Sequence, residues 1–526
     1  MSRNRFSCLV TTVAIMVCCV AGETVAEDGT RPSSPEFVVG GHETGPVDPP
    51  VRLPEAQRRT EPAQTWIRGP YTSIQINVDA SGNNIVADAA NEPSIAVDPR
   101  WPNRMAVGWR QFDSIASNFR QAGAGFTTDG GRSWTAGVLD PGVFRSDPVL
   151  GFATDGTFYY DSLRYIETPE TLWCEVSRSP NAGEDWGGFV YAHGGDKQWM
   201  TVDRTGGSGD GNLYQASWSL YSCCGDTDFT RSMDGAASFE APVAMPGAPY
   251  WGTASVGPDG TLYVAGNSDS GPVVVRSSTV QNPALPLDFD SAALVDLGGE
   301  IIALVGPNPV GILGQMTVAT DHSGGTTHGN VYTLASVDPP GSDPLDVMFS
   351  RSTDGGVNWS PPTRINDDVG DNWQWFGAMS VAPNGRIDVI WNDTRADPGG
   401  YRSELMYRSS SDGGFNWGPN TTLSADFDPQ IGWPNQNKIG DYYDLVSDDV
   451  GVHVVYAATF NGEQDVYYLR IGDYDCNANG VSDTDDIAQQ FSPDLNQNGI
   501  PDECEALIFV DGFELGDTTV WSTTTD

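Results

Sequence analysis

The chain has 526 residues, of which 70 are acidic and 27 basic, and its formal net charge at pH 7 is −43. Nucleic acid and anionic membranes are poor partners for such a surface, because phosphate binding needs lysine and arginine. The acidity does not indicate disorder, since 16 tryptophans, 61 glycines and regular apolar runs are typical of a packed, turn-rich chain. Five histidines also argue against a histidine-rich transition-metal centre.

The N-terminus has the pattern of a secretory signal. Arg3 and Arg5 precede a mostly apolar run over 8–22, and small residues follow it. The run is short for a membrane span, and no later segment approaches the roughly 18 consecutive apolar residues that a spanning helix needs. We predict a signal peptide over 1–26, an exported chain without a transmembrane segment, and a Pro- and Gly-rich linker over 27–72.

One motif, Ser/Thr-x-Asp-x-Gly-x-x-Trp, recurs along the chain. Its central Asp or Asn falls at 129, 181, 234, 354 and 412, so successive copies are 52, 53, 120 and 58 residues apart. The interval of 120 spans two repeats, one of which has lost its motif. The Asp and the Ser/Thr hydroxyl are expected to accept hydrogen bonds from a tight hairpin turn, where glycine supplies φ > 0. The tryptophan is expected to pack back onto the same repeat.

The motif resembles the Asp box (BNR repeat) of the sialidase superfamily. This resemblance implies a β-propeller of four-stranded blades and a connection to carbohydrates. In that family the boxes lie at the periphery of the blades, away from the active site, which implies that these aspartates are structural.

Seven short apolar segments open the repeats, 51 to 65 residues apart, and each is followed by a turn and another strand. Apolar runs bounded by Gly, Asp and Pro at this density are typical of an all-β fold. We predict a β-propeller over 73–472, seven-bladed with six blades as the alternative. The strand at 73–78 is expected to complete the last blade, which lacks an outer strand of its own. The openings are 93–97, 148–152, 199–202, 252–256, 316–319, 377–381 and 442–446.

Two oxygen-rich loops, 19 residues apart, follow the predicted propeller. Each places donors at loop positions 1, 3, 5, 7, 9 and 12 and glycine at position 6, which suits calcium. The loops resemble dockerin loops and thrombospondin type-3 repeats, which implies calcium as the cofactor of a module over 473–505. Seven residues separate the loops, too few for a true dockerin, so a cohesin partner is not expected. The predicted ligands are Asp475, Asn477, Asn479, Val481, Asp483, Asp486, Asp494, Asn496, Asn498, Ile500, Asp502 and Glu505.

Five cysteines remain after the predicted signal, so at least one is left unpaired if the others form disulfides. Cys476 and Cys504 lie near opposite ends of the paired loops and are expected to form a disulfide. The pairing of the other three stays open. The tail over 506–526 resembles the C-terminal tails of exported bacterial proteins, so the chain is expected to be secreted or held at a bacterial cell surface.

In a propeller, the residues just before the innermost strands form the rim of one face, where positions far apart in sequence converge. Converging carboxylates can act as acid, base or nucleophile in glycoside cleavage, and aromatic rings can stack on sugars. The alternative is a ring that gathers water or a cation without any reaction. The candidate catalytic residues are Glu92, Asp147, Asp196 and Asp441, and the candidate substrate-binding residues are Lys197, Trp251, Trp373 and Trp375.

The resemblance to catalytic sialidases is incomplete, because no Arg-Ile-Pro segment precedes the first blade and no Tyr–Glu pair can be assigned. Two functions remain open. The expected one is a non-catalytic extracellular module that binds a glycan or a protein and is stabilised at its C-terminus by calcium. The alternative is a carbohydrate-active enzyme, either a glycoside hydrolase or a polysaccharide lyase, with the rim carboxylates as its site.

Overall fold

The computed structural model describes residues 48–50, 58–167, 170–220, 222–302 and 306–504. The chain divides into two units, Met1–Ser33 and Ser34–Asp526, and the first lies wholly outside the described residues. The predicted signal peptide and the predicted C-terminal tail lie outside them as well. Within the described residues, no helix is long and apolar enough to cross a bilayer.

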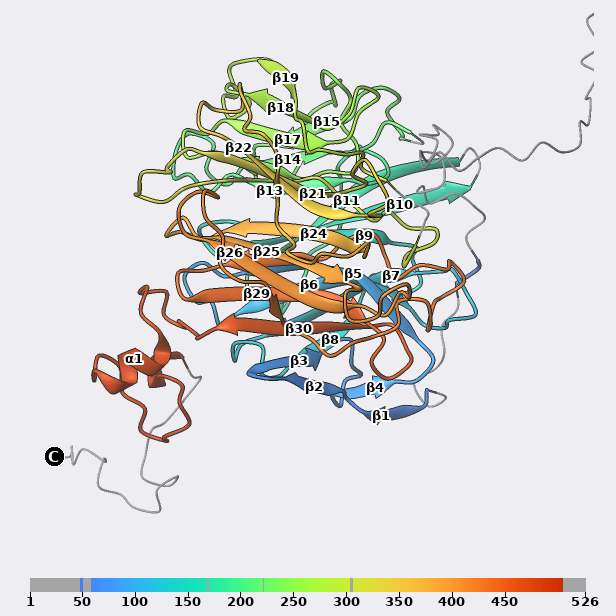
Figure 1. Ribbon diagram of the computed structural model, residues 1–526, viewed down its shortest axis with the longest axis vertical. Helices are drawn as coiled ribbons and strands as arrows, with labels where there is room; N and C mark the ends of the chain where they lie inside the picture. The colour runs from blue at the N-terminus through green and yellow to red at the C-terminus, as the bar shows by residue number, and fades with distance from the viewer. Residues whose placement is uncertain (1–47, 51–57, 168–169, 221, 303–305, 505–526) are drawn as a thin grey trace, which may run out of the picture. The chain divides into compact units, whose positions relative to one another are not determined.

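Seven antiparallel sheets follow one another along the chain and form a seven-bladed β-propeller, as predicted. The first strands of neighbouring blades contact each other all the way round the ring, which makes them the innermost strands and rules out six blades. In Figure 1, the first strands β5, β9 and β24 lie near the middle of the view, and the outer strands β19 and β2 lie toward its upper and lower ends.

The first three blades differ in their outer edges. The third sheet has only three strands, and a bridge between Phe229 and Val243 marks the place of a fourth. The strands are β5 (Ala89–Val97), β6 (Met105–Phe112), β7 (Gln121–Thr127) and β8 (Thr135–Leu139); β9 (Ser146–Phe152), β10 (Phe158–Glu167), β11 (Glu170–Ser179) and β12 (Val190–Tyr191); and β13 (Trp199–Val202), β14 (Leu213–Ala216) and β15 (Phe229–Ser232).

The next three blades each have four strands. The fourth blade is complete although its third turn has lost the repeated motif. The strands are β16 (Ala254–Val256), β17 (Leu262–Gly266), β18 (Val273–Ser277) and β19 (Ser291–Leu294); β20 (Thr317–Thr320), β21 (Val331–Val337), β22 (Asp346–Ser352) and β23 (Thr363–Arg364); and β24 (Gln374–Val381), β25 (Ile387–Asp393), β26 (Glu404–Ser410) and β27 (Thr421–Thr422).

The last blade joins the two ends of the propeller. Its chain-terminal strand β30 pairs with β3, where Ser73 lies opposite Leu469, so an N-terminal strand completes this blade as predicted. The blade runs in the order β28, β29, β30, β3, β2. The strands are β28 (Asp444–Ser447), β29 (Gly451–Ala458), β30 (Asp465–Gly472), β3 (Tyr71–Gln75) and β2 (Thr65–Arg68), with β1 (Thr60–Pro62) and β4 (Asn83–Ile85) as a separate pair.

The predicted linker over 27–72 is therefore too long at its C-terminal end. Strands β1 and β2 lie within it, and most of their side chains are exposed, including Ile67 at 71%. An outer strand with little buried surface carries no apolar alternation, so composition alone made this segment look like a linker.

The repeated motif forms the turn between the third and fourth strands of a blade. In the copy after β22, the Ser352 hydroxyl accepts the buried Gly356 N–H at 2.9 Å, and the exposed Asp354 accepts the Asn358 N–H at 2.9 Å. The motif tryptophans also pack between blades: Trp134 lies 5.5 Å from the ring of Tyr468 in the last blade. The motif therefore holds turns and neighbouring blades together.

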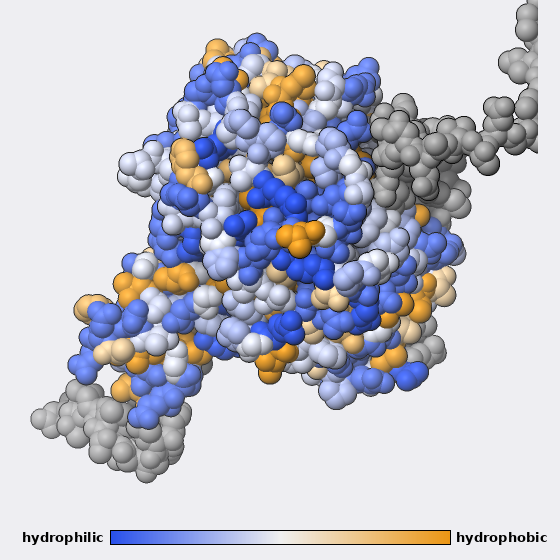
Figure 2. Space-filling model, in the orientation of Figure 1, coloured by the Kyte–Doolittle hydropathy of each residue, from blue (hydrophilic) through white to orange (hydrophobic). Residues whose placement is uncertain are grey.

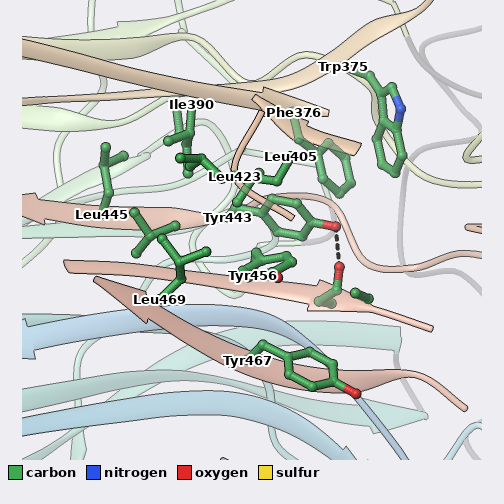
Figure 3. Close-up of a cluster of buried hydrophobic side chains, with 14 of the residues drawn as sticks. Trp375, Phe376, Ile390, Leu405, Leu423, Tyr443, Leu445, Tyr456, Tyr467 and Leu469 are labelled. Carbon is green, nitrogen blue, oxygen red and sulfur yellow. Dashed lines mark hydrogen bonds between the residues drawn. The ribbon is translucent and has the colours of Figure 1, made fainter. Parts of the chain in front are cut away.

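Apolar side chains fill the spaces between blades. Figure 3 shows the cluster between the sixth and seventh blades, where Ile390 and Leu405 face Leu445 and Leu469. Each fully buried aliphatic side chain contributes about 1.5–3 kcal/mol relative to exposure. After β30, the described chain adds only a short helix, α1 (Asp483–Ala488), and the 3₁₀ turn Asp502–Cys504.

Candidate functional site

The structure brings the four candidate carboxylates together. They belong to a continuous ion-pair network, the rim network, whose members come from the first, second, third and seventh blades. All members lie just before or within the inner strands except Arg110, which lies in the second strand of the first blade. The sequence analysis predicted the four carboxylates and Lys197 as site residues, but not Arg110 or Lys438. The members are Glu92, Arg110, Asp147, Asp196, Lys197, Lys438 and Asp441.

Lys197 is the centre of one half of the network. Its Nζ hydrogen-bonds Asp441 and lies 3.6 Å from Asp147 and 4.0 Å from Asp196. Lys438 also donates to Asp441, at 2.8 Å. One carboxylate from the seventh blade therefore receives two ammonium groups.

Glu92 is the centre of the other half. Its Oε2 lies 3.2 Å from Arg110 Nε, and its Oε1 lies 3.5 Å from Lys438 Nζ. Arg110 also reaches Asp147, at 4.0 Å. The first and last blades are thus joined by charge at the point where the ring closes.

The backbone at the rim adopts an unusual conformation in a repeated way. Five residues occupy the equivalent position at the start of the inner strand in five blades, and all have φ between 49° and 58°: Glu92, Asp147, Lys197, Trp251 and Phe376. Positive φ is uncommon for residues other than glycine and costs roughly 1–3 kcal/mol each. Such strain persists only where the surrounding fold holds it, so the fold itself aims these side chains.

The network is closed to solvent, which corrects the expectation of an open rim. Glu92, Asp196 and Asp441 are fully buried, and Lys197 is 8% exposed. A loop over 306–314 is hydrogen-bonded to it, with the Ile312 N–H donating to Asp441 at 3.1 Å. The sequence could place these side chains on one circle but could not show which loops lie against them.

Burial and charge separate the pKa values of two carboxylates. Burial, together with Asp147 and Asp441, raises the pKa of Glu92 to about 8 despite Arg110 and Lys438. Burial also favours protonation of Asp441, but the neighbouring cations outweigh it and hold its pKa well below the usual range. With Glu92 protonated and the other carboxylates counted as ionised, three negative groups face three positive ones, so the network is neutral.

The aromatic candidates do not line an accessible surface. Trp251 and Trp375 are buried, the first against Tyr250 and the second in the cluster of Figure 3. Adjacent apolar residues enclose both rings, so neither ring presents an open face for a sugar in this structure. Trp373 is half-buried, with its ring 6.2 Å from that of Tyr401.

Two members of the network escaped the sequence analysis. Arg110 lies in the middle of β6 and is fully buried, and Lys438 lies in a loop before β28. An arginine inside an otherwise buried strand is itself a signal, because such a charge needs a partner. Nothing in the local sequence marks Lys438.

The two predicted calcium loops have the same backbone geometry. Asp475 accepts hydrogen bonds from the N–H groups of Asn479 at 3.1 Å and Gly480 at 2.7 Å. Asp494 accepts from the equivalent groups, four and five residues ahead, at 3.1 and 2.9 Å. The 19-residue repeat in sequence is therefore also a repeat in structure.

The first loop fits a cation by its donors. Asp483 and Asp486 are buried, and each has one carboxylate oxygen with no hydrogen-bond partner among the described residues. Burial raises the pKa of Asp483 to about 6, although the Cys476 N–H and Arg132 act in the opposite direction. In the described part of the chain no group of three Asp, Glu, His or Cys side chains is placed to hold a metal ion by itself, so an ion in this loop would also need amide and carbonyl oxygens. Glu505 lies outside the described residues.

The cysteines are assigned as follows. Cys476 and Cys504 form a disulfide across the paired loops, with Cα atoms 5.9 Å apart, as expected. Cys223 and Cys224, left open by the sequence, are bonded to each other. Cys174 is buried and free.

Comparison with known proteins leaves the activity of the chain open. No family model and no curated protein matches. Similar solved structures include a protein of unknown function from Dyadobacter fermentans (13% identity, TM-score 0.44, 76% of this chain and 97% of that one). A leech intramolecular trans-sialidase (13%, 0.38, 76% and 70%) and a polysaccharide lyase of family PL25, an ulvan lyase (10%, 0.41, 76% and 96%), are also similar.

Proposed function

We propose that the chain is an exported, calcium-stabilised β-propeller that binds an extracellular glycan or protein and does not cleave it. The burial of the rim network carries this proposal. A general acid or base must come within hydrogen-bond reach of the reacting group. Glu92 and Asp441 are fully buried and already contact cations, so no substrate atom can reach them in this conformation.

The rim network is better explained as a lock on the ring. It links Glu92 and Arg110 of the first blade to Lys438 and Asp441 of the last. The pairing of β3 with β30 closes the same ring by backbone hydrogen bonds. Breaking a buried ion pair from one side is strongly destabilising, so these residues support closure rather than chemistry.

A glycan suits the molecule better than a large protein partner on the face seen in Figure 2. Hydrophobic side chains there lie in scattered groups with hydrophilic and neutral side chains between them. Large protein interfaces usually need an extended apolar patch. Sugars, in contrast, are bound by dispersed polar groups with small apolar contacts.

Calcium is proposed for the paired loops because the oxygen donors of both loops suit a hard cation. In the first loop, two buried carboxylate oxygens also have no hydrogen-bond partner among the described residues. When bound, the ion would neutralise the acidic loops. The residues that would hold it in the described part of the first loop are Asp475, Asn477, Asn479, Val481, Asp483 and Asp486.

The second candidate function is a carbohydrate-active enzyme, a glycoside hydrolase or a polysaccharide lyase. It is favoured by the separated pKa values of Glu92 and Asp441, since acid and base groups in active sites are often pushed apart in this way. The loop over 306–314 would have to move away from the network for this function.

A paired assay on the full chain tests the two candidates. A glycan array measures binding, and a polysaccharide-degradation screen detects new reducing ends or unsaturated products. Binding without products supports the proposal. Products that disappear in Asp441→Asn, in protein whose circular dichroism matches the wild type, would overturn it in favour of the enzyme.

A further inference from the structure

The far end of the channel carries a second ring of equivalent positions. Each inner strand ends in a turn, and the second residue after the strand occupies an equivalent place in every blade. Most of these positions hold Pro, Thr or Asp, but the third blade has arginine and the fifth has histidine. The seven residues are Pro99, Thr154, Arg204, Pro258, His322, Pro383 and Asp449.

Five of the seven positions line a cavity in the described part of the chain, and Thr154 and Pro258 do not. The cavity has a volume of about 580 Å³ and runs along the inner strands, with Arg204, His322 and Asp449 among its lining residues. Small-molecule sites typically have about 300–1,000 Å³. The cavity is therefore large enough for one or two sugar rings.

Arg204 has no carboxylate partner among the described residues. Its guanidinium lies over the ring of Phe152, 4.0 Å from the centroid, and within the described residues it donates no hydrogen bond and pairs with no carboxylate. The side chain is exposed to solvent at the channel mouth. The protein around the channel still lowers the pKa of Arg204 to about 10 by partial desolvation, so it stays positive at neutral pH.

The buried arginines Arg110 and Arg145 are already paired with carboxylates. Arg110 pairs with Glu92 at 3.2 Å, and Arg145 pairs with Glu175 at 2.8 Å. An exposed guanidinium that lines a cavity and has no carboxylate partner can instead pair with an incoming anion. In a chain with a net charge of −43, an arginine left without a carboxylate at a cavity mouth is a candidate for an external anion.

We propose that the channel mouth around Arg204 binds the anionic group of an acidic sugar, a uronate or a sulfated residue. This rests on the proposed binding function and narrows its ligand class. A guanidinium matches the planar oxygens of a carboxylate or sulfate with two parallel hydrogen bonds. Phe152 holds the guanidinium in place and shields one side of it.

The remaining surroundings suit a sugar rather than a bare anion. Val202, Val256 and Phe152 give the wall apolar surface for the C–H faces of a ring. Across the ring of turns, Asp449 also lines the cavity. The acidic surface repels long polyanions, which favours a chain end that enters the mouth.

Titration calorimetry with the calcium-loaded full chain tests the proposal. The probes are an oligogalacturonate, the same oligosaccharide with its carboxyls reduced, and a sulfated neutral oligosaccharide. The variants are Arg204→Gln, Arg204→Lys and, as the control, Arg178→Gln, which removes an exposed arginine of β11 outside the cavity. Urea midpoints check that all of them fold.

We expect at least one anionic probe to bind the wild type and the Arg178→Gln control equally, and the carboxyl-reduced probe to bind neither. Arg204→Gln should weaken binding about tenfold or more, and Arg204→Lys should fall between them because it keeps the charge but loses the planar pair. Equal binding by Arg204→Gln, or no binding of either anionic probe to the wild type, would overturn the proposal. If neutral glycans still bind, the proposed binding function survives that failure.

Discussion

The charge balance of the rim network predicts that two of its carboxylates respond differently to neutralisation. Because the pKa of Glu92 is raised to about 8, this side chain keeps its proton at pH 7. Glu92→Gln then exchanges one neutral side chain for another of the same size. We expect it to change the free energy of unfolding by about 1 kcal/mol or less.

In contrast to Glu92, Asp441 has a pKa well below the usual range, so it is ionised at pH 7. Lys197 and Lys438 both contact its Oδ2, and its Oδ1 accepts the Ile312 N–H. Asp441→Asn leaves two buried ammonium groups with one counter-charge fewer, and breaking a buried pair in this way costs about 3–5 kcal/mol. Glu92 can lose its proton in this variant and restore the balance, so we expect the lower end, about 3 kcal/mol, and a greater loss in the double variant.

Urea unfolding of the full chain at pH 7, followed by tryptophan fluorescence, measures these effects. The control is Asp426→Asn, which removes an exposed partner of Arg402 at 2.6 Å and should cost about 0–1 kcal/mol. If Glu92→Gln destabilises the chain as much as Asp441→Asn does, Glu92 is ionised in the folded protein and the rim network is not neutral as inferred.

The raised pKa of Glu92 also predicts how the stability of the chain changes with pH. Between the ordinary glutamate pKa of 4.5 and the folded value of about 8, the folded chain holds a proton on Glu92 that the unfolded chain releases. The contribution of Glu92 therefore favours folding at low pH and is lost as the pH rises through this range. Glu92→Gln should remove that part of the slope in urea midpoints measured from pH 5 to pH 9, and an unchanged slope would contradict the assignment.

Other predictions concern single features. Ser352→Ala should lower the free energy of unfolding by about 1–2 kcal/mol, because a buried N–H loses its acceptor, whereas the exposed Asp354→Ala should cost less; the reverse order in urea unfolding would refute this. Calorimetry should show two calcium ions per chain, with one lost in Asp475→Ala and one in Asp494→Ala; the absence of any calcium heat would remove the metal proposal. Burial and a neighbouring arginine lower the pKa of His453 to about 4. Between pH 6.5 and pH 4 the unfolded chain therefore binds a proton at this histidine that the folded chain does not, so stability falls as the pH drops. His453→Gln should reduce the slope of stability against pH in this range.

Local features of the chain were predictable from the sequence because short-range physics determines them. The repeated turn motif, the short apolar runs and their spacing predicted seven blades, and β3 does pair with β30. The disulfide between Cys476 and Cys504 followed from their places at the ends of the paired loops. Even the convergence of Asp147 with Asp441 followed, since equivalent positions of a ring repeat lie on one circle.

Only the tertiary structure decided what those positions can do. Whether Asp441 faces solvent depends on the loop over 306–314, which is more than a hundred residues away in the chain. The sequence around Trp251 does not show whether its side chain lines a groove or is buried in a core. The partners of Glu92 come from the middle of β6 and from an irregular loop, at no fixed spacing. Arg204 stands out only once the surrounding blades show that no carboxylate pairs with it among the described residues. Burial and pairing are set by contacts between distant segments, and a linear pattern of residue types does not encode those contacts locally.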